Sequence, residues 1–236
     1  MPFQTLNARL IRSTSLSDFT KHLEFEAEQK FGFVPGQWLS LKQMKPDGEE
    51  ITRAYSISSP PDGNHFALCL NRVQDGFMSN YLCDLEVSAE ISAQGPFGNF
   101  ILRPPLRDTI FIATGTGIAP YRSMLGWLFA DHSRRQDKQF WLLFGSRTEK
   151  DIYYHEEFLA LAAQHNDFHY LPTLSRGAQN WNGWRGYVQE HVAEIVNGRA
   201  EMNAYICGLD KMVSANRDLL KSLGWDRKSI LYEKYD

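Results

Sequence analysis

The N-terminal part of the chain alternates between apolar and polar positions in short runs. From Phe3 to about Leu102 these runs are rich in β-branched and aromatic residues, and turn sequences such as Pro46-Asp47-Gly48 separate them. A period of two is typical of strands that bury one face, so this segment is expected to form an antiparallel β domain, a small barrel. Residues 76–85 break the alternation because their apolar positions have helical spacing, which predicts one inserted helix.

After Arg103-Pro104-Pro105 the pattern changes to continuous apolar runs, each followed by a stretch with helical spacing. Strands that alternate with helices in this way predict a parallel, doubly wound sheet of the α/β class. The change of pattern near Pro104 divides the chain into two expected domains, residues 1–103 and 104–236. The expected strands are residues 109–114, 141–146, 168–175, 204–208 and 230–235, and the expected helices are residues 118–130, 152–163, 187–196 and 211–223.

Composition and charge narrow the class of protein without identifying it. Of the 236 residues, 43% are hydrophobic and 22% are charged, which is ordinary for a globular protein and excludes disordered and collagen-like classes. The net charge of -3 gives no reason to expect nucleic-acid binding, and no apolar run has the length of a membrane span. Because Cys69, Cys83 and Cys207 contain no C-x-x-C pair, no metal site is expected, and a reducing cytoplasm fits best.

A glycine-rich turn lies between an expected strand and an expected helix, in the sequence Thr114-Gly115-Thr116-Gly117-Ile118-Ala119-Pro120. Gly115 and Gly117 let a ligand approach the backbone, and the helix N-terminus that follows favours a pyrophosphate. Pro120 suits the first helical turn, where its missing N–H would have no partner. Such turns also occur for purely structural reasons, so this motif alone leaves nucleotide binding and a structural turn equally open.

The sequence Arg53-Ala54-Tyr55-Ser56 lies within an expected strand. Because side chains alternate along a strand, Arg53 and Tyr55 project to one side and Ser56 to the other. A tyrosine ring can stack on a flavin, and a guanidinium can hold a phosphate through two hydrogen bonds. An exposed arginine and a half-buried tyrosine are also common in ordinary strands, so this motif by itself favours the structural interpretation.

The order of several motifs along the chain is more specific than any one of them. R-A-Y-S is followed by G-F-M-S-N-Y-L-C-D-L, G-P-F-G, G-T-G-I-A-P and C-G-L. In this order the sequence resembles the ferredoxin–NADP reductase family over nearly the whole chain. The resemblance implies a FAD-binding β-barrel domain, an NADP-binding α/β domain, and an enzyme that passes electrons between NADP(H) and ferredoxin or flavodoxin, which are one-electron carrier proteins.

The resemblance also implies a set of flavin-binding residues. Arg53 would bind the FAD pyrophosphate, Tyr55 would stack on the isoalloxazine ring, and Ser56 would lie near its N5 atom. The segment from Arg72 to Gly76 is shorter than in the plant enzymes, which clamp the adenine there, so a bent or more exposed FAD is expected, with FMN as the alternative. The implied flavin set is Arg53, Ala54, Tyr55, Ser56, Leu70, Asn71, Arg72, Gly76, Phe77, Met78, Ser79, Thr116 and Tyr235.

The residues that match the nucleotide segments of the family favour NADP over NAD. Dinucleotide domains select NAD with a carboxylate near the ribose 2′-hydroxyl and NADP with cations and hydroxyls. Loop arginines are also commonly just solvated, and Glu149 and Asp151 are close enough in sequence to neutralise Arg147. The implied NADP set is Gly115, Thr116, Gly117, Pro120, Arg147, Ser175, Arg176, Arg185, Tyr187, Cys207, Gly208 and Leu209.

Hydride transfer requires the nicotinamide to be held close to the flavin in a fixed geometry. By the resemblance, Cys207 approaches the nicotinamide, Ser56 hydrogen-bonds near the flavin N5 atom, and Glu233 affects protonation or charge beside them. Tyr235 would cover the flavin face on which the nicotinamide must stack. These four residues form the expected catalytic set. Without the resemblance, the position of Cys207 at a strand end favours a buried structural thiol.

Two other functions share part of this evidence. The reductase component of an oxygenase or hydroxylase has the same two domains and a different protein acceptor. A non-catalytic flavin- or nucleotide-binding module that senses redox state belongs to another class, and it would not need the whole catalytic set. The expected protein is a monomer, and its docking candidates for an acidic carrier are basic residues of the flavin domain, namely Arg9, Arg12, Lys42, Lys45 and Arg72.

Overall fold

A computed structural model describes residues 4–235, which form two compact units. One unit contains the described residues up to Leu102 together with Ala119–Asp131, and the other contains Arg103–Ile118 and the described residues from His132 onward. Residues 1–3 and 236 of the two expected domains lie outside the described residues. Since the segment 119–131 groups with the N-terminal unit, the domain boundary between residues 103 and 104 stays a prediction.

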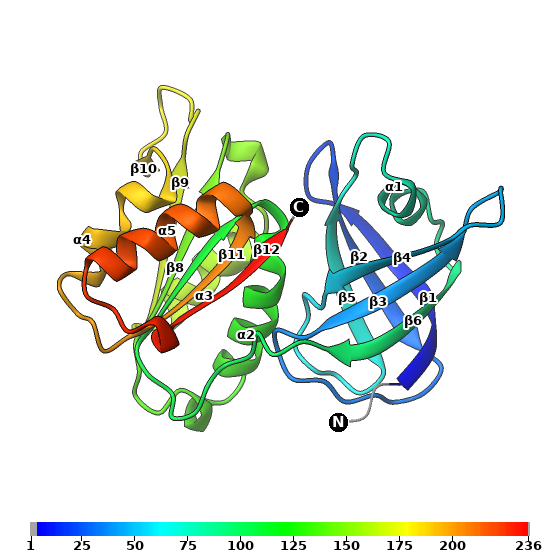
Figure 1. The fold of residues 1–236 in the computed structure, drawn as a ribbon, viewed down its shortest axis with the longest axis horizontal. Coiled ribbons are helices and arrows are strands. Elements are labelled where there is room, and N and C mark those ends of the chain that lie inside the picture. Colours follow the sequence, from blue (N-terminus) through cyan, green and yellow to red (C-terminus); the bar gives the residue numbers. More distant parts are fainter. Residues whose placement is uncertain (1–3, 236) are drawn as a thin grey trace. The chain divides into compact units, whose positions relative to one another are not determined.

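The first unit is built on an antiparallel sheet whose strands lie in the order β4-β3-β6-β1-β2-β5 (Figure 1). A bridge between Ile57, just after β4, and Leu68 in β5 brings the outer strands together, so the sheet curls into a half-barrel. The antiparallel β domain expected from the alternating pattern is therefore confirmed. Its strands are β1 (Gln4–Ser15), β2 (Thr20–Ala27), β3 (Trp38–Met44), β4 (Glu50–Ser56), β5 (His65–Asn71) and β6 (Glu90–Phe97).

Alternating side chains of these strands fill the interior of the curled sheet. In β1, Leu6, Ala8 and Leu10 are buried while the residues between them are exposed. Phe25 of β2 and Phe66 of β5 stack with their ring centroids 5.2 Å apart. Removing such apolar surface from water is the main term that favours the curled sheet over an extended one.

Two helices complete the first unit. The inserted helix expected within residues 76–85 is α1 (Phe77–Cys83), which buries Met78 and Leu82 in the same core. The other helix is α2 (Ala119–Phe129), from which Arg122 and Ser123 donate hydrogen bonds to the carbonyl oxygens of Ser58 (3.0 Å) and Ser59 (2.6 Å). The segment that follows β4 is thereby held against α2.

The second unit is built on a sheet whose strands lie in the order β10-β9-β8-β7-β11-β12, and neighbouring strands are parallel, which confirms the expected sheet. The chain moves outward from β7 to β10 and then returns to the other side of β7. This reversal puts a topological switch point between β7 and β11, where sheets of this type bind ligands. The strands are β7 (Thr109–Thr114), β8 (Phe140–Ser146), β9 (Phe168–Leu174), β10 (Trp184–Arg185), β11 (Asn203–Leu209) and β12 (Ile230–Tyr235).

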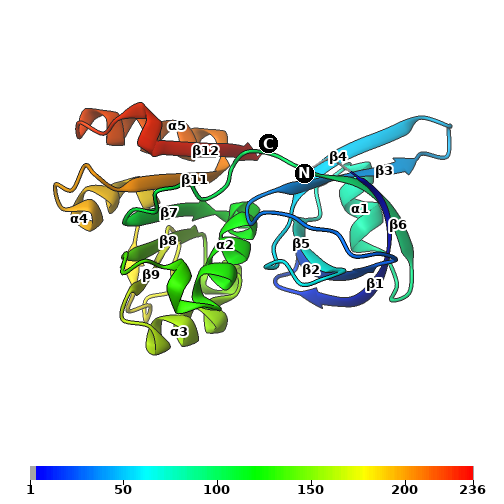
Figure 2. The ribbon, with the colours of Figure 1, turned by 90° about the horizontal axis from the view of Figure 1, so that it is seen from below.

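Helices lie on both faces of this sheet. Figure 2 shows α5 (Asp210–Ser222) on one face and α3 (His155–Gln164) on the other. The single helix expected over residues 187–196 is wrong in detail, because a 3-10 turn (Val188–Glu190) precedes α4 (Val192–Val196). His191, between them, has a φ of -107° and its ring nitrogen lies 2.9 Å from the carbonyl oxygen of Arg185. This side-chain contact with the β10 backbone interrupts the regular helical path.

Candidate functional site

The expected flavin motif lies on β4, an outer strand of the first sheet. Arg53 is exposed and donates a hydrogen bond to the carbonyl oxygen of Thr52 (2.9 Å). Tyr55 is half-buried against the core, and burial raises the pKa of its hydroxyl to about 12, so the ring keeps its proton at neutral pH. Ser56 is buried. The strand thus presents a guanidinium and a neutral aromatic ring on one side, as the alternation predicts.

Ser58 adds a feature that the sequence motif did not identify. Its hydroxyl is buried and has no hydrogen-bond partner within residues 4–235. Leaving such a group unpaired costs about 1–3 kcal/mol, so a ligand that supplies a polar atom here would be favoured. This observation fits a polar cofactor at the end of β4. Its position two residues beyond Ser56, and hence on the same side of an extended chain, is the signal that could have found it.

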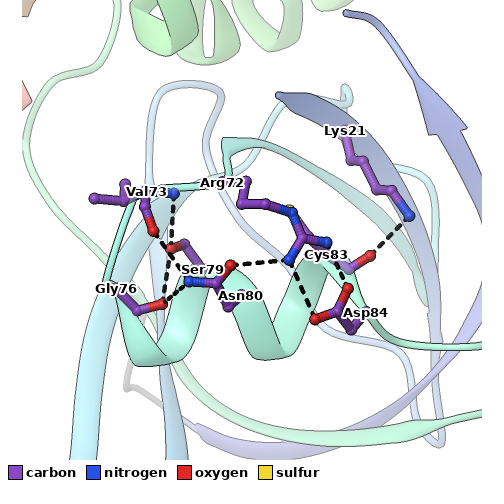
Figure 3. A network of polar contacts seen from close by, with 8 residues as sticks. All are labelled: Lys21, Arg72, Val73, Gly76, Ser79, Asn80, Cys83 and Asp84. Carbon is purple, nitrogen blue, oxygen red and sulfur yellow. Dashed lines mark hydrogen bonds and ion pairs between the residues drawn. The ribbon is translucent and has the colours of Figure 1, made fainter. Parts of the chain in front are cut away.

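The segment from Val73 to Ser79, expected to hold flavin phosphates, forms a closed hydrogen-bonded turn (Figure 3). The Ser79 hydroxyl accepts from the Val73 N–H (3.1 Å) and donates to the Gly76 carbonyl (3.2 Å), while the Asn80 amide donates to the carbonyls of Val73 (3.0 Å) and Gly76 (2.7 Å). The Ser79 hydroxyl is therefore engaged within the turn. What the segment can offer a phosphate is its main-chain N–H groups, since the first amides of a helix have no intrahelical partner.

Arg72 is also engaged within this segment. Its guanidinium donates to Asn80 Oδ1 (2.8 Å) and forms a two-point ion pair with Asp84, and these bonds hold the pKa of the Asp84 carboxyl below its usual range (Figure 3). The side chains of two neighbouring residues in the expected flavin set also make contacts within the protein. Leu70 is 2% exposed in the core, and Asn71 Oδ1 accepts a hydrogen bond from Thr20 (2.6 Å). Their side chains stabilise the fold, so a contact with the cofactor is left to the main chain.

At the switch point of the second unit, the turn that follows β7 packs closely against the end of β11. A Cβ atom on Gly117 would lie 2.3 Å from the carbonyl oxygen of Cys207, and one on Gly208 would lie 2.4 Å from Thr114 Oγ1. Both positions therefore require glycine. Gly115 differs, because its φ is +56° and a Cβ would meet nothing within 4 Å, which leaves space beside the backbone.

The same end of β7 carries an unsatisfied polar group. Thr114 Oγ1 is buried and has no hydrogen-bond partner in the described part of the chain. The glycine-rich turn itself is a 3-10 turn (Gly115–Ile118) that leads into α2, in which Pro120 is the second residue. An orphaned hydroxyl beside an open glycine backbone at a switch point is a suitable cradle for the polar part of a dinucleotide. The residues present therefore fit a nicotinamide nucleotide.

Members of the expected catalytic set meet at the ends of β11 and β12. Cys207 is opposite Glu233 in the strand register, and Leu209 is opposite Tyr235. Burial, and then the nearby Glu233, raises the pKa of the Cys207 thiol, while a hydrogen bond with Tyr235 offsets part of the shift. Burial also raises the pKa of Glu233 to about 7. The group thus contains a neutral thiol and a carboxyl that can exchange a proton near neutral pH.

Arg147 and Arg176 lie side by side at the ends of β8 and β9. The Arg176 N–H donates to the Arg147 carbonyl oxygen (2.8 Å), and both side chains are exposed. Glu149 instead accepts a hydrogen bond from the Ala178 N–H (2.8 Å), and Asp151 accepts from the backbone and hydroxyl of Thr148. Within residues 4–235, neither acid forms an ion pair with Arg147. The alternative that these acids neutralise Arg147 is therefore not observed, and the two cationic groups remain exposed together.

Arg185 has a different environment from these two arginines. Its guanidinium donates to carbonyl oxygens of the loop between β9 and β10, including that of Ala178 (2.7 Å). The other predicted nucleotide residues lie at the carboxyl ends of the strands or directly after them. Tyr187 is 62% exposed and Leu209 is 64% exposed, while the Ser175 hydroxyl lies 3.4 Å from the Ser146 carbonyl oxygen.

The flavin and nucleotide sets are divided between the units. Thr116 and Tyr235, both included in the flavin set, belong to the second unit, and the strand and turn residues from Arg53 to Ser79 belong to the first. In the part of the chain that the structure describes, no cluster of three or more His, Cys, Asp or Glu residues could hold a metal ion. Among the same residues no helix is long and apolar enough to cross a membrane.

Comparison with known proteins gives a consistent result over both units. Residues 7–101 match the model of the oxidoreductase FAD-binding domain, and residues 111–218 match that of the oxidoreductase NAD-binding domain. The chain is 44% identical over 246 aligned positions to ferredoxin–NADP reductase B of Sorangium cellulosum, covering 100% of this chain and 98% of that protein. It is 33% identical to the glycine betaine monooxygenase reductase subunit of Chromohalobacter salexigens, covering 89% of this chain and 59% of that protein.

Solved structures share the fold at lower sequence identity. A ferredoxin NADP+ reductase from Neisseria gonorrhoeae with bound FAD and NADP matches with a TM-score of 0.82 and 20% identity, covering 99% of both chains. A cytochrome P450 reductase from Amycolatopsis matches with a TM-score of 0.88 and 24% identity, covering 99% of this chain and 70% of that one. At these identities the likeness concerns the fold.

Proposed function

Because the chain belongs to the ferredoxin–NADP reductase family, we propose that it passes electrons between NADP(H) and a one-electron carrier protein through bound FAD. The observation that carries this proposal is the match along essentially the whole of a ferredoxin–NADP reductase at 44% identity. It agrees with a FAD-binding model on the first unit and a nucleotide-binding model on the second. When bound, FAD supplies the exchange between two-electron and one-electron chemistry.

The residues of the first unit hold and orient the flavin in this proposal. Arg53 binds the pyrophosphate, because its exposed guanidinium keeps most of its donors. The Tyr55 ring stacks on the isoalloxazine, while Ser56 and the unpaired hydroxyl of Ser58 offer hydrogen bonds to its polar edge. The main-chain N–H groups of Phe77, Met78 and Ser79 complete the phosphate site. The compact turn from Arg72 to Gly76 supports a bent or exposed FAD.

The second unit binds the nicotinamide nucleotide at the switch point in this proposal. The open backbone at Gly115 and the Thr114 hydroxyl accommodate its pyrophosphate, and Arg147 and Arg176 recognise the 2′-phosphate of NADP. Cys207 would contact the nicotinamide, and Glu233 would hold or release a proton beside it. Tyr235 keeps the role expected from the sequence, that of an aromatic ring for the flavin.

Kinetics with both nicotinamides test the choice of NADP. The two exposed arginines predict a kcat/KM for NADPH about tenfold or more above that for NADH, since each charge-assisted bond to a phosphate contributes about 1.5–3 kcal/mol. Arg147→Ala and Arg176→Ala should remove most of this preference and leave the NADH reaction nearly unchanged. If the unmodified protein had the same kcat/KM for NADH as for NADPH, the proposed preference for NADP would be excluded.

The carrier protein in this proposal is ferredoxin or flavodoxin. The basic residues singled out in the sequence as docking candidates each form an ion pair at the surface, which lowers their free charge and is weak enough for a carrier to displace. Arg9 pairs with Glu26 (3.3 Å), Arg12 with Glu24 (3.5 Å) and Lys42 with Glu50 (3.3 Å). Lys45 pairs with Glu49 and Arg72 with Asp84. Their role as docking residues stays a prediction.

The second candidate function is the reductase component of an oxygenase. It is favoured by relatives of that type, including the 2-halobenzoate 1,2-dioxygenase electron transfer component of Burkholderia cepacia at 31% identity. The chain spans 59% and 64% of two such components. A redox-sensing module is less well supported, because Cys207, Glu233 and Tyr235 are gathered at one site. A reducing cytoplasm fits the free cysteines Cys69, Cys83 and Cys207, and the monomer expected from the sequence stays a prediction.

Rapid-mixing experiments separate these functions. The protein reconstituted with FAD should be yellow, should bleach on mixing with NADPH, and should then reduce ferredoxin or flavodoxin. Bleaching by NADPH with reduction of an oxygenase component, and of neither carrier, would favour the second candidate. A protein that binds FAD but is not bleached by NADPH or NADH would favour the sensing module.

A further inference from the structure

An open pocket of about 720 Å³ lies at the amino-terminal edge of the sheet in the second unit. It is lined by residues 106–108, which precede β7, by Lys138, which precedes β8, and by residues 198–202, which precede β11. Because these strands are parallel, this edge is opposite their carboxyl ends, where the nucleotide site is proposed. The pocket is therefore separate from the residues of the flavin and nucleotide sets.

The charged residues of the lining are three basic residues and two acidic ones. Arg107 is exposed and Lys138 is half-buried, and neither side chain forms a hydrogen bond or ion pair with another residue between 4 and 235. Asp108 Oδ1 accepts a hydrogen bond from the Gln139 N–H (3.0 Å), so part of this carboxylate is already engaged. Glu201 is the other acidic residue of the lining, and it is exposed. The pocket thus contains free positive charge.

Arg199, the third basic residue, is held in place by the protein itself. Its Nε and Nη2 donate to the carbonyl oxygens of Val196 (3.1 Å) and Ile195 (2.8 Å) at the end of α4, and its guanidinium lies 4.4 Å from the centroid of the Trp141 ring. The N–H groups of Nη1 form no hydrogen bond within the described residues. A ligand that accepts from Nη1 does not have to order a flexible side chain, which lowers the cost of binding.

The lining also limits the class of ligand. None of the described residues that line the pocket is aromatic, so its wall offers no surface on which a nucleobase could stack. The volume is within the range of about 300–1,000 Å³ that is common for small-molecule pockets. Phosphate and carboxylate oxygens are the acceptors that arginine and lysine bind most strongly, so several such groups on one molecule suit the three cations.

We propose that this pocket binds a small, non-aromatic polyanion, a pyrophosphate or a polycarboxylate, between Arg107, Lys138 and Arg199. Arg107 and Lys138 supply unpaired positive charge, and Arg199 supplies a fixed donor edge. Glu201 weakens the binding through repulsion. The inference goes beyond the proposed function and does not depend on it, since none of these residues is assigned to the flavin or to the nicotinamide nucleotide.

Calorimetric titration of the FAD-loaded protein with pyrophosphate, and separately with citrate, tests the inference. Saturating 2′-phospho-AMP is present throughout, so that the proposed nucleotide site is blocked. At least one probe should bind, and the tighter one identifies the ligand as a phosphate or as a carboxylate. No binding of either probe at millimolar concentrations would overturn the inference, as would binding that occurs only without 2′-phospho-AMP. If 2′-phospho-AMP itself does not bind, the NADP proposal fails, and single variants still locate the probe.

Arg107→Ala and Lys138→Ala should each weaken binding of the probe by about tenfold, the usual effect of losing a charge-assisted hydrogen bond. Glu201→Gln should strengthen it by about threefold, because a repulsive charge at the surface is removed. Arg227→Ala removes an exposed arginine before β12, at the same edge of the sheet but outside the lining, and is the matched control. An equal loss in Arg227→Ala would indicate general attraction by surface charge, and weaker binding in Glu201→Gln would indicate a ligand with a positive group. Either result would overturn the inference.

Discussion

Burial of Glu233 gives the end of β12 a group that titrates close to neutral pH. Its pKa is raised to about 7, whereas the thiol of Cys207, opposite it in the strand register, has its pKa raised and stays protonated. Near neutral pH the net charge of this pair therefore changes by one unit, when Glu233 gains or loses its proton. A carboxyl poised in this way is suited to hold or release a proton during turnover.

We expect Glu233→Gln to stabilise the protein increasingly as the pH rises from about 5 to about 8. In the unfolded chain the carboxyl titrates near 4.5 and in the native protein near 7, so the native state binds more protons between these values and its stability falls with rising pH. Glutamine does not ionise and escapes this loss, which is at most about 3 kcal/mol for such a shift. Thermal unfolding at both pH values measures the difference, with the exposed Glu194→Gln as control. The prediction would be contradicted if the variant and the unmodified protein differed in stability by the same amount at both pH values.

Single residues also show the limit of sequence-based prediction. The position of Arg53 and Tyr55 on one side of a strand followed from the two-residue period alone. The occupation of Arg185 by loop carbonyls did not, because the acceptors are backbone atoms whose direction depends on the loop conformation. The unpaired hydroxyls of Ser58 and Thr114 were equally invisible, since an absent partner is a property of the packed structure.

At the scale of elements, the contact between the glycine-rich turn after β7 and the end of β11 is the feature on which the proposed nucleotide site depends most. The turn lies so close to β11 that Gly117 has no room for a side chain, and Gly208 has none beside Thr114. Gly115, between the same strand and helix, has a positive φ but open space. Close packing therefore requires glycine at position 117, backbone conformation favours it at position 115, and both reasons apply to Gly208, whose φ is +142°.

Gly117→Ala should therefore both destabilise the second unit and abolish tight nucleotide binding, because the new Cβ would overlap the Cys207 carbonyl oxygen. Overpacking of this kind costs about 1–3 kcal/mol.

Gly115→Ala should lower the free energy of unfolding by about 1–2 kcal/mol, because of the positive φ. It should also weaken nucleotide binding, because the new Cβ would crowd the open space. Gly48→Ala, in a turn with φ +87° and open surroundings, is the control for that strain alone. Unfolding in urea and NADPH titration measure both effects; normal binding by Gly117→Ala would refute this account.

Arg72 and α1 form a second element whose shape should matter for cofactor binding. Arg72→Ala removes the hydrogen bonds to Asn80 and Asp84 that hold the turn between residues 73 and 79 against α1. We expect a rise in the Kd for FAD of about tenfold, with little change in the Kd for 2′-phospho-AMP, because several charge-assisted bonds that preorganise the site are lost. Lys42→Ala, which breaks an ion pair elsewhere on the same unit, is the control. Unchanged flavin retention would show that the turn keeps its shape unaided.

Most elements could be predicted because hydrophobic periodicity reports which face is buried. The strand at residues 109–114 and the helix within 76–85 are examples. The segment 187–196 was predicted as one helix because its apolar spacing continues through His191, and the side-chain contact that interrupts it comes from β10, a short strand with no pattern of its own. Contacts between distant segments therefore account for the difference.

At the scale of the whole molecule, the net charge of -3 conceals how the basic residues of the first unit are used. Adjacent strands place Arg9 opposite Glu26 and Arg12 opposite Glu24, so their charges are balanced locally. The strand register determines this pairing, and residue types alone do not reveal it. A surface that attracts an acidic carrier must then come from groups outside these pairs, or from pairs that the carrier breaks.

We expect Arg9→Ala and Arg12→Ala to change the kcat/KM for ferredoxin or flavodoxin by less than about twofold, because exposed, paired charges contribute little to steering. The dependence of the rate on salt should also stay the same. Glu26→Gln provides the matched comparison, since it changes the surface by one charge in the opposite direction and should also change the rate by less than about twofold. A loss of about tenfold in Arg9→Ala would mean that the carrier does displace Glu26.

The closed loop between β9 and β10 has a practical consequence for protein engineering. Its curvature is maintained by backbone carbonyls and the Arg185 guanidinium, while Arg147 and Arg176 point into solvent from the adjacent strand ends. Arg185 thus maintains the loop, whereas in the proposed function the preference for NADP rests on Arg147 and Arg176. A designer who wishes to convert the protein to NADH can replace the two solvent-facing arginines by neutral or acidic residues and should retain Arg185 as part of the scaffold.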